Sequence, residues 1–280
     1  MNTRSIVMKT LNGIPESMLI PLAARAVETD HSEPIINDPY SKTIFEQLDY
    51  PFATITQAPS SQIGISIRTF ILDRVVKYFI EHTKHPLIIN IGSGLDTRYK
   101  RLKLDDVPWF DIDVPEAIEM RAPFFPETRY HKMIAKSMLD FDWIGQVKQD
   151  PIYHESQDIL FIFEGILMYF DKATNAMLLE QISEAFKDHN LLFAIEHCSK
   201  TIAKHTKEHK SVSQLKSHPP FKYGYNTLRQ LNAIKPSQLE VACEFNYFDY
   251  FSHRWGAFGL FRFIPFLKHR FNNKIVLMMN

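Results

Sequence analysis

Residues 87–98 read Leu-Ile-Ile-Asn-Ile-Gly-Ser-Gly-Leu-Asp-Thr-Arg, an apolar run that ends in a turn containing Gly92 and Gly94. The β-branched residues before Gly92 favour a buried strand, and two glycines separated by one residue permit a tight bend and a close approach of a ligand. Amide groups at the start of the following helix are then available to polar ligand atoms. The stretch predicts a strand, turn and helix at a nucleotide site, although a turn without a ligand would use the same glycines.

A second acidic motif follows at the distance expected for such a site. Trp109 to Pro115 reads as the next strand, and Asp113 lies 19 residues beyond Gly94. A carboxylate at the carboxyl end of the second strand can accept hydrogen bonds from both hydroxyls of a ribose. Asp113 could instead cap the helix that opens at Pro115, and the two uses are compatible.

The residues after the glycines discriminate between nucleotides. A dinucleotide-binding fingerprint has a third glycine where this chain has Thr97. Asp96 places negative charge where a pyrophosphate would sit, which disfavours a dinucleotide but suits the ammonium end of S-adenosylmethionine. We therefore expect S-adenosylmethionine as the cofactor, with a nicotinamide-dependent dehydrogenase as the alternative.

Apolar runs alternate with helical stretches on both sides of this motif, which is typical of a parallel sheet. The pattern predicts an α/β fold with a doubly wound, mostly parallel, seven-stranded sheet. The expected strands are 87–91, 109–112, 129–135, 159–163, 191–195, 245–251 and 274–279. The expected helices are 17–28, one from Pro39 through Leu48, 62–82, 97–102, 115–121 and 172–187.

We expect the 280 residues to form one domain. Residues 1–82 would form an N-terminal helical cap, residues 83–198 the cofactor-binding core, and residues 199–280 a lid segment and the C-terminal strands. Since additions at the carboxyl edge of an α/β sheet cover the site, the acceptor pocket is predicted between the cap and the segment after Cys198.

Composition excludes several classes of function. Thirty-two basic residues cancel 32 acidic ones, so no global field attracts nucleic acid or an anionic membrane. The longest apolar stretch, Ile159 to Phe170, is shorter than the roughly 20 residues that cross a bilayer. We expect neither partner.

Cysteine usage and the N-terminus predict a cytoplasmic protein. Cys198 and Cys243 are too few for a disulfide framework, and residues 1–11 lack the apolar core of a secretory signal. His205 and His209 have a spacing that can bind zinc, but Thr206 stands where the metalloprotease motif needs glutamate. We expect no metal.

Together the motifs resemble class I S-adenosylmethionine-dependent methyltransferases of the leucine carboxyl methyltransferase group, particularly the tetracenomycin-type polyketide O-methyltransferases. The likeness covers most of the chain up to Cys198 and is faint beyond it. It rests on residues 16–26, Asn37-Asp38-Pro39, Arg68 with Asp73, residues 92–98, 111–115 and 137–143, and Glu164-Gly165-Ile166-Leu167-Met168-Tyr169.

The resemblance implies a role for each matching residue. Gly92 and Gly94 would cradle the methionine part of the donor, Arg68 would meet its carboxylate, and Asp113 would hold the ribose. The other implied contacts with the donor are Arg25, Asp96, Glu164, and Ser137 with Met138 beside the adenine, where the leucine carboxyl enzymes have Asp-Leu. As structural alternatives, Arg25 and Arg68 could pair with surface carboxylates. The apolar flanks of Glu164 predict its burial, which requires a cationic partner or ligand.

The expected reaction is O-methylation of a small-molecule carboxylate or hydroxyl, for example in a polyketide-like metabolite. A carboxylate is already ionised at neutral pH, whereas a phenol or alcohol needs a base, for which His197, Tyr169 and His253 are candidates. The alternatives are methylation of a protein C-terminal carboxylate and a non-catalytic protein that binds the donor.

Overall fold

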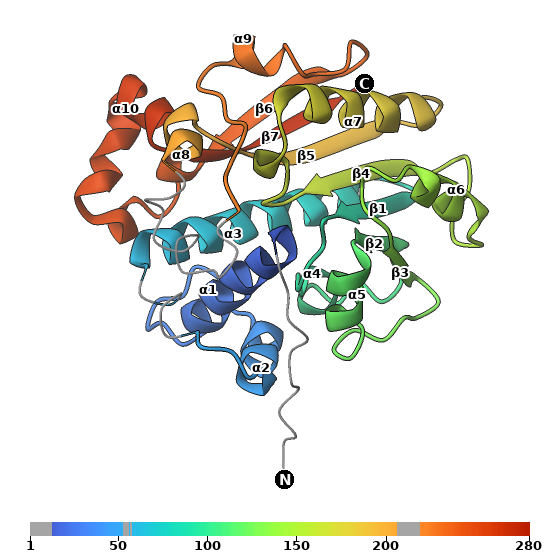
Figure 1. Ribbon diagram of the computed structural model, residues 1–280, viewed down its shortest axis with the longest axis horizontal. Helices are drawn as coiled ribbons and strands as arrows, with labels where there is room; N and C mark the ends of the chain where they lie inside the picture. Colours follow the sequence, from blue (N-terminus) through green and yellow to red (C-terminus); the bar gives the residue numbers. More distant parts are fainter. Residues whose placement is uncertain (1–12, 53–55, 57, 206–218) are drawn as a thin grey trace.

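The computed structural model describes residues 13–52, 56, 58–205 and 219–280, and in this part of the chain a seven-stranded sheet forms the centre (Figure 1). Its order is β3-β2-β1-β4-β5-β7-β6, with β1 to β5 parallel and β7 antiparallel to β5 and β6. The strands are β1 (Pro86–Ile91), β2 (Trp109–Asp113), β3 (His131–Ala135), β4 (Asp158–Phe163), β5 (Leu191–Cys198), β6 (Glu240–Asn246) and β7 (Asn273–Met279). The predicted fold class is confirmed.

The register brings three strand ends to one edge of the sheet. Ile91, the last residue of β1, pairs with Ile112 of β2 on one side and Phe163 of β4 on the other. The strand order reverses at β1 and β4, because β2 and β3 lie on one side of β1, and β4 and β5 lie on the other. Open α/β sheets bind ligands in the crevice at such a reversal, beyond the carboxyl ends of the strands.

Both faces of the sheet are covered by helices (Figure 1). On one face, α3 (Pro59–His82) packs Leu72 and Val76 in a cluster with Ile88 of β1 and Leu160 of β4. On the other face, α6 (Asp142–Gln149) and α7 (Lys172–Ala185) pack in a cluster with the alternate residues of the same strands. This burial of alternate residues on opposite faces explains why β1 and β4 are apolar almost throughout.

The N-terminal helices lie over the carboxyl edge of the sheet. The 3-10 helix η1 (Ile14–Met18) leads into α1 (Leu19–Thr29), which packs with α2 (Pro39–Gln47) and with Ala117 and Met120 of α5 (Pro115–Arg121). Asp38 caps α2 by accepting from the backbone N–H of Ser41 at 3.0 Å, and Pro39 follows in the first turn. The expected helices at the N-terminus are therefore present, as is the short α4 (Arg98–Arg101) after the glycine turn.

The structure corrects the expected last-but-one strand. Residues 245–251 were predicted as a strand, but β6 ends at Asn246 and the 3-10 helix η6 (Tyr247–Asp249) follows. The aromatic content of this segment fits a strand locally, yet Tyr247 and Phe248 are buried from a helical turn. The paired segment is the more polar Glu240–Asn246, whose partner β7 determines its conformation.

Several short helices were not predicted. They are η3 (Leu167–Tyr169), α6, α8 (Lys200–Lys204), α9 (Leu228–Leu231), η7 (Ser252–Phe263) and α10 (Pro265–Arg270). Apart from η7, each spans eight residues or fewer, and a helix this short has too few turns for its hydrophobic periodicity to be recognised in the sequence. None of the helices in the described part of the chain is both long and apolar enough to cross a bilayer.

Candidate functional site

The glycine turn after β1 is held against the end of β2. The backbone N–H of Gly92 donates to the carbonyl of Ile112 at 2.8 Å, and Gly92 and Gly94 have φ angles of 69° and 45°. A Cβ added at Gly94 would lie 2.8 Å from the Cβ of Met18 in η1. Gly94 therefore lets the N-terminal helical segment pack closely onto the turn.

Asp113 is fixed beside this turn by two backbone amides. Its Oδ2 accepts from the N–H of Gly94 at 2.7 Å, and its Oδ1 accepts from the N–H of Val114 at 2.8 Å. Helix α5 has Val114 as its N-cap residue and no side-chain cap, so Asp113 does not cap it. Burial raises the pKa of Asp113 to about 6.

Arg121 supports the turn from the last part of α5. Its Nη1 donates to the carbonyls of Gly94 at 3.1 Å and Asp96 at 2.6 Å, and its Nη2 donates to Oδ2 of Asp111 at 2.5 Å. Arg121 was not predicted as a site residue, because an arginine at a helix end is usually exposed. Its burial depends on the tertiary packing of α5 beneath the turn.

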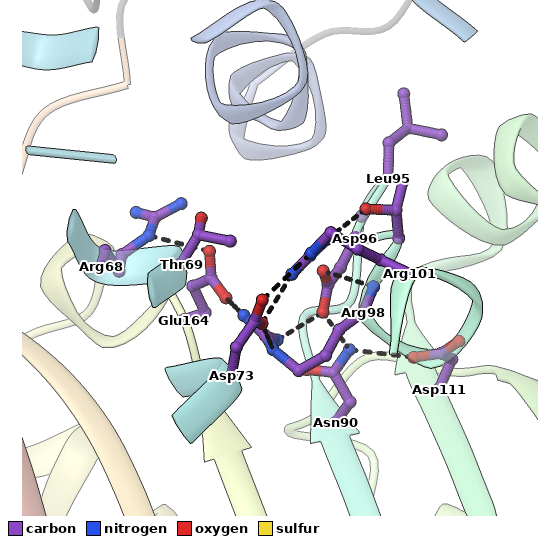
Figure 2. Close-up of polar contacts among 12 residues, drawn as sticks. Arg68, Thr69, Asp73, Asn90, Leu95, Asp96, Arg98, Arg101, Asp111 and Glu164 are labelled. Atoms are coloured by element: carbon purple, nitrogen blue, oxygen red, sulfur yellow. Dashed lines mark hydrogen bonds and ion pairs between the residues drawn. The ribbon is translucent and has the colours of Figure 1, made fainter. Parts of the chain in front are cut away.

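Glu164, just beyond β4, receives hydrogen bonds from two arginines (Figure 2). Its Oε1 accepts from Nε of Arg68 at 2.8 Å, and its Oε2 accepts from Nη2 of Arg98 at 2.7 Å. Burial opposes the ionisation of Glu164, but the guanidiniums of Arg68 and Arg98 outweigh it and hold the pKa well below its usual range. The predicted burial with a cationic partner is thus present.

Arg68 is shared between two strand ends. Besides Glu164, its Nη1 donates to Oε2 of Glu196 on β5 at 2.8 Å, and Glu196 also accepts from the hydroxyl of Tyr247 at 2.9 Å. Within the described residues, Nη2 of Arg68 makes no hydrogen bond. One edge of this guanidinium is therefore available to an anionic group. Glu196 was not predicted, since an acid within an apolar strand gives no sign of which face it occupies.

Asp96 forms an ion pair with Arg98. Its Oδ1 accepts from the backbone N–H of Arg98 at 3.0 Å, and its Oδ2 accepts from Nη1 of the same residue at 2.5 Å (Figure 2). Arg98 is fully buried and also donates from Nε to Asp73 at 2.9 Å, so three carboxylates surround it. Arg98 belongs to the motif of residues 92–98, but no role was predicted for it.

These contacts continue into one buried ion-pair network. Arg101 joins Asp73 to Asp38 (Figure 2 shows its contact with Asp73), and Arg25 donates from Nε to Asp38 at 3.0 Å and from Nη2 to the carbonyl of Leu95 at 2.8 Å. Neither Arg25 nor Arg68 pairs with a surface carboxylate. The network contains four guanidiniums and five carboxylates: Arg25, Arg68, Arg98, Arg101, Asp38, Asp73, Asp96, Glu164 and Glu196. Its formal charge is one unit negative.

A cavity of about 500 Å³ opens at the carboxyl edge of the sheet, over β1, β2 and β4. All nine residues predicted to contact the cofactor line it: Arg25, Arg68, Gly92, Gly94, Asp96, Asp113, Ser137, Met138 and Glu164. Ser93 also lines it, and its buried Oγ has no hydrogen-bond partner among the described residues. The structure thus brings the predicted cofactor residues together around one space.

The other end of the cavity is formed by the N-terminal helices and by residues after Cys198. Its walls are largely aromatic: Tyr169, Phe170, Phe221, Tyr247, Trp255 and Phe271. Nε1 of Trp255 and Oδ1 of Asn273 are buried there without hydrogen-bond partners among the described residues. The cavity therefore lies between the two parts of the chain where the acceptor pocket was predicted.

The structure corrects the prediction that His197 is a candidate base, because this residue lies away from the cavity. On β5, Glu196 points to the cavity, and the next side chain points to the opposite face, where His197 packs against the ring of Tyr225 at 4.9 Å. Burial, with the nearby charge of Lys274, lowers the pKa of His197 to about 3. His197 does not line the cavity, and it has no charge to exchange near neutral pH. His253 is exposed on η7 and also lies outside the cavity lining.

Tyr169 lines the cavity and is buried. Burial raises its pKa to about 12, although an interaction with Ser17 acts in the opposite direction. A phenol with this pKa stays protonated at neutral pH, so it can donate a hydrogen bond but is poorly suited to removing a proton.

The pair His205 and His209, whose spacing could bind zinc, cannot be placed, because His209 lies outside the described residues.

Comparison with known proteins identifies one family. The leucine carboxyl methyltransferase model matches residues 18–183. The tetracenomycin polyketide synthesis O-methyltransferase TcmP of Streptomyces glaucescens is 28% identical over 173 residues, which cover 61% of this chain and 62% of that protein. The S-adenosyl-L-methionine-dependent methyltransferase dpfgK of Gibberella zeae is 28% identical over 193 residues, covering 64% and 63%. The chain thus spans about three fifths of the length of the curated relatives it matches.

Solved structures support the fold. A candidate methyltransferase from Thermobifida fusca superposes with a TM-score of 0.59 at 10% identity, covering 95% of this chain and 94% of that one. A DUF574 family protein from Streptomyces avermitilis superposes with a TM-score of 0.58 at 10% identity, covering 91% and 96%. At this identity the similarity establishes the fold alone.

Proposed function

The chain belongs to the leucine carboxyl methyltransferase family, and on this premise we propose that it transfers a methyl group from S-adenosylmethionine to an oxygen atom of a small molecule. The observation that carries the proposal is the meeting of the glycine turn, Asp113 and the Glu164 network around one cavity at the reversal of strand order. The names of the curated relatives point in the same direction.

The residues present suit this cofactor. Each oxygen of Asp113 accepts one backbone hydrogen bond and keeps a lone pair, which can accept a hydroxyl of the ribose. The free edge of Arg68 and the unpartnered Oγ of Ser93 can bind the carboxylate of the methionine part. Ser137 and Met138 line the cavity beyond β3, where the adenine was expected.

The charge of the network supports a cationic ligand. Five carboxylates outnumber four guanidiniums, and Asp113 adds a further acid at the cavity wall. A buried excess of negative charge is costly unless a cation offsets it. The sulfonium and ammonium of S-adenosylmethionine would supply that positive charge, whereas the pyrophosphate of a nicotinamide dinucleotide would add to the repulsion. The dehydrogenase alternative is therefore disfavoured.

When bound, S-adenosylmethionine supplies a methyl group on a positively charged sulfur. The protein's contribution is mainly to orient and enclose the reactants, since well-oriented reactions gain about 7–11 kcal/mol over free encounter. Met18 of η1 and Ile166, both packed on the glycine turn, and the aromatic wall with Phe221 would shield bound reactants from water.

The cavity favours an acceptor that needs no base. None of the described residues lining it is a histidine, Tyr169 stays protonated with its pKa near 12, and Asp113, whose pKa is raised to about 6, is assigned to the ribose. A carboxylate acceptor is already ionised at neutral pH. We therefore propose a small apolar carboxylic acid as the preferred acceptor, with Tyr169 and Nε1 of Trp255 as hydrogen-bond donors to it.

The proposal is tested with S-adenosylmethionine carrying a tritiated methyl group, offered with panels of aromatic carboxylic acids, phenols and peptides with a free C-terminus. We expect label in a small-molecule product that releases methanol in mild alkali, because methyl esters hydrolyse where methyl ethers do not. Alkali-stable label would instead identify a hydroxyl acceptor. Labelled peptide would favour C-terminal carboxyl methylation, and tight binding of the donor without any product would favour a non-catalytic protein. The Asp113→Ala variant is the negative control.

A further inference from the structure

Exposed apolar side chains gather on η7 and α10. Within the described residues, Phe263 and Phe266 are 68% and 67% exposed, more than any other large hydrophobic side chain. The same segment contributes further exposed residues, and we call the set the 258–271 face: Phe258, Leu260, Phe263, Ile264, Phe266 and Phe271. Large apolar patches on a surface mark contact with a partner or a membrane.

The aromatic rings of this segment form a continuous surface. The ring of Phe261 lies 5.5 Å from that of Phe258 and 5.9 Å from that of Phe271. The guanidinium of Arg270 lies over both Phe266, at 5.5 Å, and Phe271, at 5.7 Å. The rings of Phe258, Phe266 and Phe271 are therefore close in space and not scattered over the surface.

The unpaired charges of this segment are positive. No acidic residue occurs from Tyr250 to Asn280. Arg262 and Arg270 are exposed beside the rings, and α10 contacts α8, whose Lys200 and Lys204 are also exposed. Lys268 is paired with Asp249 at 2.6 Å and adds no free charge. The formal net charge of zero, from which we expected no attraction to an anionic membrane, is a sum over the whole chain and does not reveal this local excess of positive charge.

We propose that the 258–271 face docks on the surface of a bilayer that contains anionic phospholipids. Aromatic and aliphatic side chains enter the headgroup boundary, while Arg262, Arg270 and the lysines of α8 meet the lipid phosphates. Figure 1 shows α10 beside α8 at one end of the molecule, opposite α6, so this end can reach a flat surface.

A second copy of the chain fits this face less well. A two-fold interface brings the same surface of both copies together. Each copy would then present Arg262 and Arg270 to the same basic surface of the other copy, and this segment offers no carboxylate to pair with them. Anionic headgroups supply the missing negative charge.

The face is continuous with the cavity. Phe271 is exposed on this face and also lines the cavity, as does Trp255 of η7. Docking would turn this side of the cavity toward the bilayer, so that an apolar acceptor could enter from the lipid. This consequence rests on the proposed function, whereas lipid binding itself does not.

Vesicle co-sedimentation of the full chain tests the proposal, with vesicles of phosphatidylcholine alone and of phosphatidylcholine mixed with phosphatidylglycerol. We expect binding to the mixed vesicles that exceeds binding to the neutral ones by at least about tenfold and weakens as salt is added. The double variant Phe263→Ser with Phe266→Ser should lose at least about tenfold in vesicle binding. Its matched control is Tyr78→Ser with Met177→Ser, which removes two exposed apolar side chains from α3 and α7.

A second set of two double variants tests the contribution of positive charge to vesicle binding. Arg262→Gln with Arg270→Gln should weaken binding to the mixed vesicles, and Arg129→Gln with Lys77→Gln, which removes two exposed positive charges elsewhere, should not. The altered side chains are exposed, so circular dichroism spectra should stay unchanged. Equal binding by the aromatic variant and its control would overturn the proposal. So would the absence of vesicle binding together with a dimer in light scattering that the aromatic variant dissociates.

Discussion

Oδ2 of Asp113 accepts a hydrogen bond from the backbone N–H of Gly94, with 2.7 Å between the two atoms. This bond joins the end of β2 to the turn after β1, so the two motifs on which the cofactor assignment rests form one structural unit. A second bond, from the N–H of Val114, fixes the other oxygen. The carboxylate is thereby oriented before a ligand arrives, and its protonation state should govern the affinity for that ligand.

The affinity for S-adenosylmethionine should depend on pH through Asp113. Its pKa is raised to about 6, so the carboxylate is ionised above this value and protonated below it. Since an ionised acceptor forms the stronger hydrogen bond, we expect the affinity to fall by about tenfold between pH 7 and pH 5. Calorimetric titrations at several pH values check this. Asp113→Asn should bind weakly at every pH, and the same pH dependence in that variant would contradict the assignment.

Glu164 should be important for stability as well as for the site. Glu164→Gln would replace a carboxylate that accepts from both Arg68 and Arg98 by an amide whose NH2 group cannot accept, so a charge-assisted hydrogen bond is lost, which typically costs about 1.5–3 kcal/mol in the free energy of unfolding. Urea denaturation measures this loss. The control is Glu184→Gln, which removes an exposed partner of Lys187 and should leave the urea midpoint unchanged. Equal urea midpoints for Glu164→Gln and Glu184→Gln would show that the ion pairs of Glu164 contribute little to stability.

Gly94 and Gly145 should respond in opposite ways to alanine. At Gly94 the added Cβ would meet Met18 at 2.8 Å in a left-handed conformation, so Gly94→Ala should destabilise the protein by at least about 1–2 kcal/mol and weaken binding of the donor. Gly145 lies within α6 with open space around its Cα, and Gly145→Ala should stabilise by about 0.5–1 kcal/mol. Thermal unfolding of both variants tests the packing of η1 on the turn.

His197 should contribute to acid sensitivity and not to catalysis. Its pKa is about 3 in the folded protein and 6.5 without burial, so below pH 6.5 the unfolded chain binds a proton that the folded chain does not. Stability from this residue is therefore constant above pH 6.5 and is lost as the pH falls toward 3, by about 2 kcal/mol at pH 5. His197→Phe should reduce the difference in unfolding free energy between pH 7 and pH 5 by about this amount. An unchanged difference would mean that His197 titrates normally.

Local patterns predicted the elements whose residues carry a strong signal. The apolar run Leu87 to Ile91 and the acid Asp113 specify a strand, a turn and a strand end from short-range chemistry, and the sheet follows from the alternation of such units. β6 could not be predicted in this way, because its polar residues become a strand only through pairing with β7. Its neighbour Tyr247 has a strand-like side chain but donates to Glu196 from a 3-10 helix.

The residues of the site likewise divide into those that the sequence predicted and those that depend on tertiary packing. Residues in the motifs, such as Glu164 and Arg68, were found and line the cavity, but their mutual contacts were not predicted. Arg121 and Glu196 depend on which way a buried side chain points, and this is decided by packing between elements distant in sequence. His197 was misplaced for the same reason, since a one-residue step along β5 transfers a side chain to the other face.

The most direct test of the central claim, that the glycine turn and Asp113 together bind S-adenosylmethionine, is isothermal titration of this compound into the wild type and the Asp113→Ala variant. Asp142→Ala is the matched control, because it removes a carboxylate that is 81% exposed on α6. We predict measurable affinity in the wild type, equal affinity in the control, and an affinity at least about tenfold lower in Asp113→Ala. Equal affinities for the wild type and Asp113→Ala, or no binding to the wild type, would contradict the account.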